Sequence, residues 1–315
     1  MKLKKKNQIL TSNRKLTPGF RLFLMTLPFL ALVFAFSYLP LWGWRYALYD
    51  YRPPKALTDC KFVGLKHITS MVSNPALARN VARVLKNTIG MSLLGMVTSW
   101  IPMVFAMFLA EIRSVKYRKF VQIMTTIPNF ISWIIVYSIA FAIFSASDGL
   151  VNNILAAVNP NWTRVSFLSD TNHMWLKMWA WGQWKGLGYS AILYVSSIAG
   201  IDQEMYEAAS IDGAGRFQKM RFITLPCLLP TFITLLIINV GNFLNRGMDQ
   251  YFAFQNAMNR EYIEVLDLYV YNQGIVGNAI SFSTAVGMTK SLVSLVLLFI
   301  ANMISKLFRD GESIF

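Results

Sequence analysis

The stretch from Gly200 to Pro226 reads Gly-Ile-Asp-Gln-Glu-Met-Tyr-Glu-Ala-Ala-Ser-Ile-Asp-Gly-Ala-Gly-Arg-Phe-Gln-Lys-Met-Arg-Phe-Ile-Thr-Leu-Pro and separates two long apolar blocks. Asp202 is a favourable N-cap residue, and an acid in the first turn, Glu204, interacts favourably with the helix dipole. Asp212-Gly213 ends that helix, because glycine adopts turn conformations that strain other residues. Leu225-Pro226 opens the next apolar block, since proline is tolerated in a first turn. The stretch therefore predicts a short helix, a turn and a second short helix at a membrane surface.

The composition on either side of this stretch is that of a membrane protein. Of the 315 residues, 55% are hydrophobic and 14% are charged, whereas soluble domains carry about 25% charged residues. This excludes an ordinary soluble enzyme and a disordered chain. The net charge is +15, but much of it lies in short stretches between apolar blocks, as it does beside membrane helices. We therefore expect contact with membrane lipid and no nucleic-acid partner.

Six apolar blocks are long enough to cross a bilayer, which takes about 20 residues. They run over about 20–41, 88–110, 121–144, 175–199, 223–245 and 287–308. The first is too long for the apolar part of a signal peptide, and five more blocks follow it. We predict an all-α, multi-pass protein of the cell (plasma or inner) membrane, with a six-helix transmembrane domain over residues 20–310 behind a basic tail at residues 1–19.

The orientation follows from basic residues near the ends of the blocks. Residues 1–21 hold seven basic residues, and residues 111–120 hold four. The connections 145–174 and 246–286 hold only three between them. Both termini and the 200–222 connection are therefore predicted to be cytoplasmic. Residues 42–87 carry eight basic residues on the predicted outer side, and an amphipathic segment lying along the outer membrane interface accounts for part of that charge.

The motifs of several catalytic classes are missing from the sequence. It has no Gly-x-x-x-x-Gly-Lys-Ser/Thr phosphate-binding loop, no Gly-x-Ser-x-Gly and no His-Glu-x-x-His. Two histidines, His67 and His173, lie far apart, and neither Cys60 nor Cys227 belongs to a Cys-x-x-Cys pair. We predict no catalytic residue and no metal site.

Polar residues inside the fifth block are candidates for a transport pathway, because a polar side chain at membrane depth usually faces the bundle interior or water. Asn239, Asn242 and Asn245 are spaced by three and so share roughly one helix face. Their amides suit hydroxyl groups of a solute. Interhelical hydrogen bonds that hold the bundle together are the alternative interpretation.

The third and fourth blocks hold further pathway candidates. In the third, Asn129 and Trp133 lie about midway, too deep for an interfacial aromatic belt, and an aromatic face suits a sugar ring. In the fourth, Trp184 and Lys185 lie deeper than the tryptophans near its start. Packing is the alternative for the tryptophans, and snorkelling to the interface is the alternative for the lysine.

The 200–226 stretch also resembles a known family. Glu207-Ala208-Ala209, then Gly213, Ile223 and Leu225-Pro226, have the spacing of the EAA loop of binding-protein-dependent ABC-importer permeases. The chain is most similar to the maltose-transporter class, in its polysaccharide and oligosaccharide branch. Asn87-Thr88, Ile127–Trp133 and Trp184–Gly188 support this resemblance, which covers residues 20–300.

The resemblance implies a type I importer permease fold that carries an oligosaccharide or glycan fragment into the cell. It implies that residues 202–222, with Glu207, Ala208, Ala209 and Gly213, dock as a coupling helix on a cytoplasmic ATPase. It also implies a second, different permease subunit and an extracytoplasmic solute-binding protein. ATP and Mg are expected to bind the ATPase, so this chain needs no cofactor and is not itself an enzyme.

Two departures from the branch leave the substrate open. Gly247-Met-Asp-Gln250 stands where a Gly-Phe-Glu-Gln stretch is frequent, and Ile127-Pro128-Asn129 stands where a Tyr and a His are common. An importer of the same architecture for glycerol phosphate is one alternative, with Lys185 as its deep cation. An ion-coupled secondary transporter is another, but it calls for deep acidic residues, and the six blocks offer none.

Overall fold

The computed structural model describes residues 17–308, in which the regular secondary structure is helical apart from one isolated bridge between Tyr49 and Phe62. The predicted all-α class is confirmed. Residues 1–16 of the predicted basic tail and the last residues of the predicted domain lie outside the described residues. The orientation of the termini stays a prediction.

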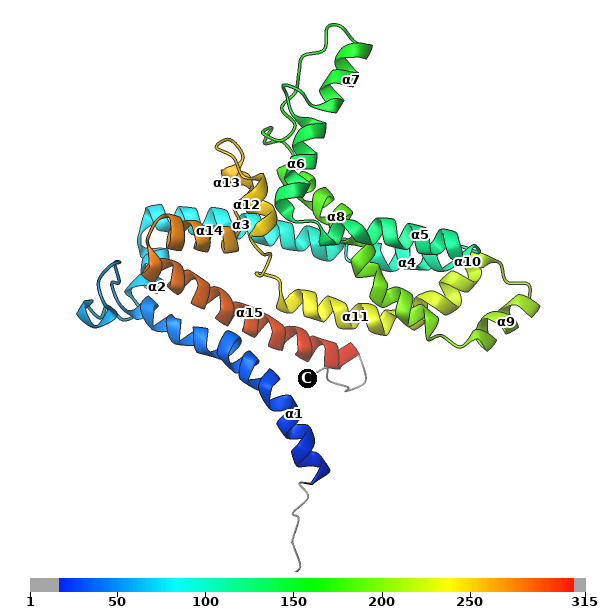
Figure 1. Ribbon diagram of the computed structural model, residues 1–315, viewed down its shortest axis with the longest axis horizontal. Helices are drawn as coiled ribbons and strands as arrows, with labels where there is room; N and C mark the ends of the chain where they lie inside the picture. Colours follow the sequence, from blue (N-terminus) through cyan, green and yellow to red (C-terminus); the bar gives the residue numbers. More distant parts are fainter. Residues whose placement is uncertain (1–16, 309–315) are drawn as a thin grey trace, which may run out of the picture.

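Two parts of the first half of the chain, residues 18–33 and residues 133–158, extend from the bundle in opposite directions (Figure 1). Its elements are α1 (Pro18–Val33), η1 (Phe34–Tyr38), η2 (Leu39–Leu48), η3 (Leu57–Asp59), α2 (Lys66–Ser73), α3 (Pro75–Val97), α4 (Ile101–Ala110), α5 (Val115–Thr126), η4 (Ile127–Phe130), α6 (Trp133–Phe144) and α7 (Leu150–Val158). Every described side chain of α1 is exposed, so this helix lies at the periphery.

The second half supplies the central helix and the C-terminal part of the bundle. Its elements are α8 (Met174–Ala199), α9 (Gln203–Ile211), α10 (Arg216–Lys219), η5 (Met220–Thr224), α11 (Leu225–Gly241), α12 (Asp249–Phe254), α13 (Arg260–Ile263), α14 (Leu266–Tyr271), η6 (Asn272–Val276) and α15 (Ile280–Phe308). Helix α8 packs against α3, α4, α5 and α11 and is the centre of the bundle.

Within residues 17–308, four helical stretches are long and apolar enough to cross a membrane: Gly19–Leu48, Pro75–Ala110, Arg216–Gly241 and Ile280–Met303. The bent pair α5–η4 and α6 makes a fifth if it counts as one span. Helix α8 coincides with the fourth predicted block, but its glycines, tryptophans and polar side chains lower its mean hydropathy. The count of six spans therefore stays a prediction.

The third predicted block is not one straight helix. Val115–Phe130 and Trp133–Phe144 meet at an angle of 105°. Proline at position 128 lacks the N–H that an α-helix needs, and Ser132 caps the new helix by accepting a hydrogen bond of 3.4 Å from the Ile135 N–H. The expectation that Trp133 lies deep within its helix is wrong, because Trp133 is the first residue of α6.

The fifth predicted block begins earlier than proline 226. Residues Arg216–Gly241 form one continuous helical stretch, in which α10 leads through the wider turn of η5 into α11. The wider turn lies directly before Pro226, where the chain loses a backbone donor. The basic segment after Gly213 is therefore the start of the long helix, not a separate short helix.

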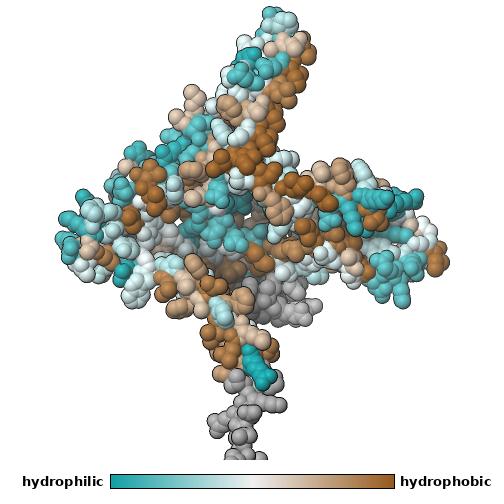
Figure 2. Space-filling model, viewed as in Figure 1, coloured by the Kyte–Doolittle hydropathy of each residue, from teal (hydrophilic) through white to brown (hydrophobic). Residues whose placement is uncertain are grey.

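The surface agrees with a protein that crosses a membrane. Figure 2 shows hydrophilic residues gathered at the two ends of the bundle, near α2 and near α9–α10, with hydrophobic residues over much of the part between them. Exposed large apolar side chains include Phe120, Ile123 and Phe130 on α5 and η4 and Leu295 and Phe299 on α15. Such a belt is stable in lipid or against another subunit, not in water.

Candidate functional site

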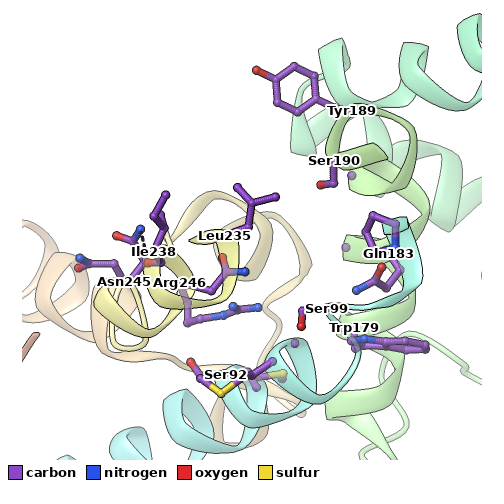
Figure 3. A pocket seen from close by; sticks show the side chains of 18 of the residues that line it. Ser92, Ser99, Trp179, Gln183, Tyr189, Ser190, Leu235, Ile238, Asn245 and Arg246 are labelled. Atoms are coloured by element: carbon purple, nitrogen blue, oxygen red, sulfur yellow. Dashed lines mark hydrogen bonds between the residues drawn. The ribbon is translucent and has the colours of Figure 1, made fainter. Parts of the chain in front are cut away.

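A cavity of about 590 Å³ lies between α3, α8 and α11, within the usual range of ligand pockets. The segment after α11 and the start of α12 complete its wall (Figure 3). Its polar lining consists of hydroxyls, amides, an indole and one guanidinium: Ser92, Ser99, Trp179, Gln183, Tyr189, Ser190, Tyr194, Asn239, Asn242, Asn245, Arg246, Gln250 and Tyr251. Amides and hydroxyls both donate and accept hydrogen bonds, so this lining suits a ligand rich in hydroxyl groups.

Side-chain hydrogen bonds fix the walls of the cavity to one another. Trp179 on α8 donates from its indole nitrogen to Thr98 Oγ1 over 2.8 Å. Gln250 on α12 donates from Nε2 to the carbonyl oxygen of Met178 over 2.6 Å. Ser92 on α3 donates to the carbonyl oxygen of Phe243. These contacts hold α3, α8 and the segment after α11 at fixed distances, so the cavity belongs to the fold.

The predicted asparagines of the fifth block all line this cavity. They do not share one helix face, however, because α11 ends at Gly241. Asn242 is the residue that ends the helix, and it donates from Nδ2 to the Ile238 carbonyl oxygen over 3.2 Å. Asn245 lies in the following segment. Whether Asn239 and Asn242 contact a solute stays a prediction.

The structure brings Asn129, Trp133 and Lys185 together, but outside the cavity. Lys185 is buried and donates from Nζ to the carbonyl oxygen of Asn129 over 2.6 Å. The same Nζ lies 5.4 Å from the centroid of the Trp133 ring, within cation–π range. The predicted deep cation thus points at the break between η4 and α6.

The two predicted tryptophans contact other aromatic rings. Trp133 packs edge-on against Phe254 with ring centroids 6.4 Å apart. Trp184 packs edge-on against Trp181 at 5.7 Å and is 44% exposed. Neither ring lines the cavity. Successive residues of a helix differ by about 100° in direction, which is why Gln183 faces the cavity and Trp184 does not.

Several cavity residues were missed by the sequence analysis. On α8, Trp179, Gln183, Gly186 and Ser190 repeat at intervals of three or four, which is the spacing of one helix face. This spacing is visible in the sequence, but none of the four residues is ionisable, so none stands out as a polar residue at membrane depth. Arg246 had no such signal, because it lies in a connection beyond the end of the fifth block.

The 202–222 segment forms a short helix and turn at one end of the molecule (Figure 1). Asp202 accepts a hydrogen bond of 3.0 Å from the Glu204 N–H and so caps α9, as predicted. Glu207 and Ala208 are exposed, and Ala209 is half-buried. Gly213 has a φ of +79° and ends the helix.

Two contacts hold this segment against the long helix that follows. The Tyr206 hydroxyl and Thr224 Oγ1 lie 2.9 Å apart and share a hydrogen bond. Lys219 donates to the Ser210 hydroxyl. A shift of α9 therefore acts directly on the start of the α10–α11 helix, whose far end lines the cavity.

Residues 103–310 match the family of the binding-protein-dependent transport system inner membrane components. The chain belongs to this family. It is therefore a multi-pass protein of the cell membrane and a non-enzymatic component of an ABC transporter that works with a solute-binding protein.

Two relatives and two solved structures are similar over most of their length. Protein LplB of Bacillus subtilis (strain 168) is 38% identical over 295 residues, covering 93% of this chain and 91% of the relative. The polygalacturonan/rhamnogalacturonan transport system permease protein YteP of the same organism is 35% identical over 292 residues, 92% of this chain and 88% of the relative.

The structures are those of a bacterial ABC transporter involved in the import of the acidic polysaccharide alginate. One matches with a TM-score of 0.79 at 30% identity, covering 91% of this chain and 96% of that chain. The second, in complex with an alginate pentasaccharide-bound periplasmic protein, matches with a TM-score of 0.81 at 30% identity, over 94% and 96% of the two chains.

Among the described residues, no group of three or more His, Cys, Asp or Glu side chains is arranged to hold a metal ion. The two cysteines, Cys60 and Cys227, are free thiols. The polar groups that line the cavity are amides, hydroxyls, an indole and the Arg246 guanidinium.

Proposed function

We propose that this chain is one transmembrane subunit of an ATP-driven importer of an oligosaccharide or glycan fragment, and that the cavity between α3, α8 and α11 is part of its pathway. The composition of the cavity carries the proposal: amides and hydroxyls from three helices converge on one space beside an indole ring. Relatives named for pectic polysaccharides and structures of an alginate importer support a carbohydrate as the solute.

The ATPase docks on α9. Its exposed face at Glu207 and Ala208 combines an acid with small side chains, which permit close approach of a partner. ATP and Mg bind that partner. Hydrolysis there moves α9, and the contacts from Tyr206 and Lys219 pass the movement to the α10–α11 helix.

A second, different permease subunit completes the membrane part. The exposed apolar side chains of α5, η4 and α15 offer surface that lipid or such a subunit covers. In this proposal the second permease packs on these side chains and continues the pathway beyond the cavity of this chain.

An importer of glycerol phosphate is the second candidate. Arg246 favours it, because a cation in the cavity suits an anionic solute. Lys185, the deep cation expected for that function from the sequence, contacts Asn129 instead.

The test is reconstitution of the complete transporter in liposomes with ATP inside and the solute-binding protein outside. We expect uptake of labelled oligosaccharide that stops when the binding protein is omitted. The chain purified without its ATPase should hydrolyse no ATP, since it has no phosphate-binding loop. Turnover by the isolated chain, or uptake of glycerol phosphate in preference to every saccharide, would overturn the proposal.

A further inference from the structure

Arg246 is the one charged side chain among the described residues that line the cavity. All other polar groups on its wall are neutral amides, hydroxyls and indole or phenol groups. An arginine stays protonated at any physiological pH. The cavity therefore carries one fixed positive charge and no carboxylate of its own.

The guanidinium reaches into the cavity because α3 leaves room for it. A Cβ atom at Gly95 would lie 3.3 Å from Nη1 and 3.4 Å from Nη2 of Arg246. Figure 3 shows the side chain extending from the segment after α11 toward Ser99 and Gln183. The buried Oγ atom of Ser99 has no hydrogen-bond partner within the protein. A donor of fixed charge and an unsatisfied hydroxyl thus line the same space.

The acids near Arg246 form no ion pair with it. None of the five ion pairs within residues 17–308 includes it. Asp267 forms an ion pair with Lys290 and accepts a hydrogen bond of 2.8 Å from the Gly247 N–H. Asp249, three residues along, is exposed and makes no ion pair with Arg246. The Tyr251 hydroxyl hydrogen-bonds to Arg246, but this group is neutral. The positive charge of Arg246 is therefore not balanced by a carboxylate within residues 17–308 and can be matched by one on a ligand.

We propose that Arg246 binds a carboxylate of the transported solute, and that the solute is an acidic saccharide built from hexuronate units. Guanidinium and carboxylate groups form two parallel hydrogen bonds of matched geometry. The neutral amides and hydroxyls around the arginine serve the hydroxyl groups of the sugar. This inference rests on the proposed function and names the chemical class of its solute.

A phosphate ester fits this cavity less well than a carboxylate. Phosphate monoesters carry roughly −1.5 to −2 charges at neutral pH, and one arginine leaves much of that charge unmatched. A hexuronate carries one charge for each carboxylate, which Arg246 matches. A neutral saccharide would leave the charge of the guanidinium unmatched.

The experiment titrates the complete transporter in nanodiscs, without the solute-binding protein, against trimers of galacturonate, mannuronate and guluronate. Each trimer is compared with its methyl ester, which keeps the sugar but loses the charge. We expect at least one acidic trimer to bind about 10- to 100-fold more tightly than its ester, as hydrogen bonds to charged groups predict. Arg246→Gln should abolish that difference, and Arg246→Lys should retain part of it.

Arg79→Gln is the matched control, because Arg79 is an exposed arginine on α3 outside the cavity. Equal binding of acid and ester by the wild type, an unchanged preference in Arg246→Gln, or tighter binding of glycerol 3-phosphate than of every trimer would overturn the inference. If the complete transporter then still imports a neutral oligosaccharide, the proposed function stands without it. If it imports no saccharide, the proposed function fails as well.

Discussion

The ammonium group of Lys185 on α8 donates a 2.6 Å hydrogen bond to the backbone carbonyl oxygen of Asn129, at the point where η4 ends and the chain turns by 105° into α6. Carbonyl groups at the end of a helix lack partners within the helix, and a cation there is favourable for the helix dipole as well. A buried lysine in the centre of the bundle thus stabilises a break in a neighbouring helix.

Replacing Lys185 by methionine should lower the stability of the transporter. The substitution keeps most of the apolar stem but leaves the Asn129 carbonyl unsatisfied, at a cost of about 1–3 kcal/mol. We expect a lower melting temperature in detergent and equal losses of uptake for acidic and neutral solutes. Lys119→Met is the control, because Lys119 is exposed on α5 and makes no such contact. A selective loss of acidic solute in Lys185→Met would place this lysine in the pathway after all.

Asn242→Ala and Trp133→Ala should distinguish a residue that contacts the solute from one that stabilises the bundle. Asn242 lines the cavity, so its loss should reduce uptake several-fold, as expected for the loss of about 1 kcal/mol of hydrogen bonding to the solute. Its hydrogen bond to the Ile238 carbonyl is exposed, so the melting temperature should change little. Trp133 packs on Phe254 and Lys185, so its loss should lower the melting temperature. Uptake and melting are measured on both variants, with exposed Asn161→Ala as the control. The reverse pattern would mean that Trp133, not Asn242, contacts the solute.

The sequence predicted local features well because the responsible residues are neighbours in the chain. The cap at Asp202 and the turn at Gly213 depend on a few residues of known conformational preference. Apolar blocks were found for the same reason. Pro128 and Ser132 also carried a local signal for the break before α6, but the apolar residues around them predicted one continuous span over residues 121–144.

The cavity was predicted only in part, because it depends on contacts between distant segments. Arg246 lies beyond the end of its helix, and its guanidinium packs closely against Gly95, some 150 residues earlier in the chain. Lys185 was a reasonable pathway candidate by depth alone. Which way it points is decided by the position of Asn129 on another helix, and no pattern within α8 shows that.

Glu264→Gln should destabilise the end of the bundle opposite α9. The Glu264 side chain is 1% exposed and pairs with Arg83 at 2.8 Å and with Arg260 at 3.1 Å. Asn272 donates a further hydrogen bond of 2.8 Å to the same carboxylate. Glutamine keeps the shape of the side chain but loses its charge, and hydrogen bonds to charged groups contribute about 1.5–3 kcal/mol. The Arg83 and Arg260 side chains are 29% and 51% exposed, so water compensates part of this loss.

The measurement is the melting temperature of the purified transporter, together with protease sensitivity of the segment around α13 and α14. Glu261→Gln is the matched control, since Glu261 is three residues away and exposed. Equal melting temperatures for the two variants would show that the Glu264 carboxylate contributes little to stability.

Gly213 should be sensitive to substitution because of its backbone and not for lack of space. Its φ is +79°, and a Cβ atom there would meet no other atom within 4 Å. A non-glycine residue in this conformation costs about 1–2 kcal/mol, less for asparagine and aspartate than for others. We expect Gly213→Val to impair co-purification with the ATPase through strain. Gly213→Asp should impair it through the added charge beside Asp212, and Glu207→Ala should do so more mildly.

Gly213→Asn is the control that separates the two causes, because asparagine has the shape of aspartate and tolerates a positive φ without adding charge. It should bind the ATPase nearly as well as the wild type. Membrane insertion, measured by the yield of folded chain, should be the same for all four variants, since α9 lies at the end of the bundle. Hydrolysis stimulated by the loaded binding protein should follow the co-purification. If Gly213→Val and Gly213→Asp both gave wild-type values in both assays, the 202–222 segment would be a connector and the ATPase would dock elsewhere.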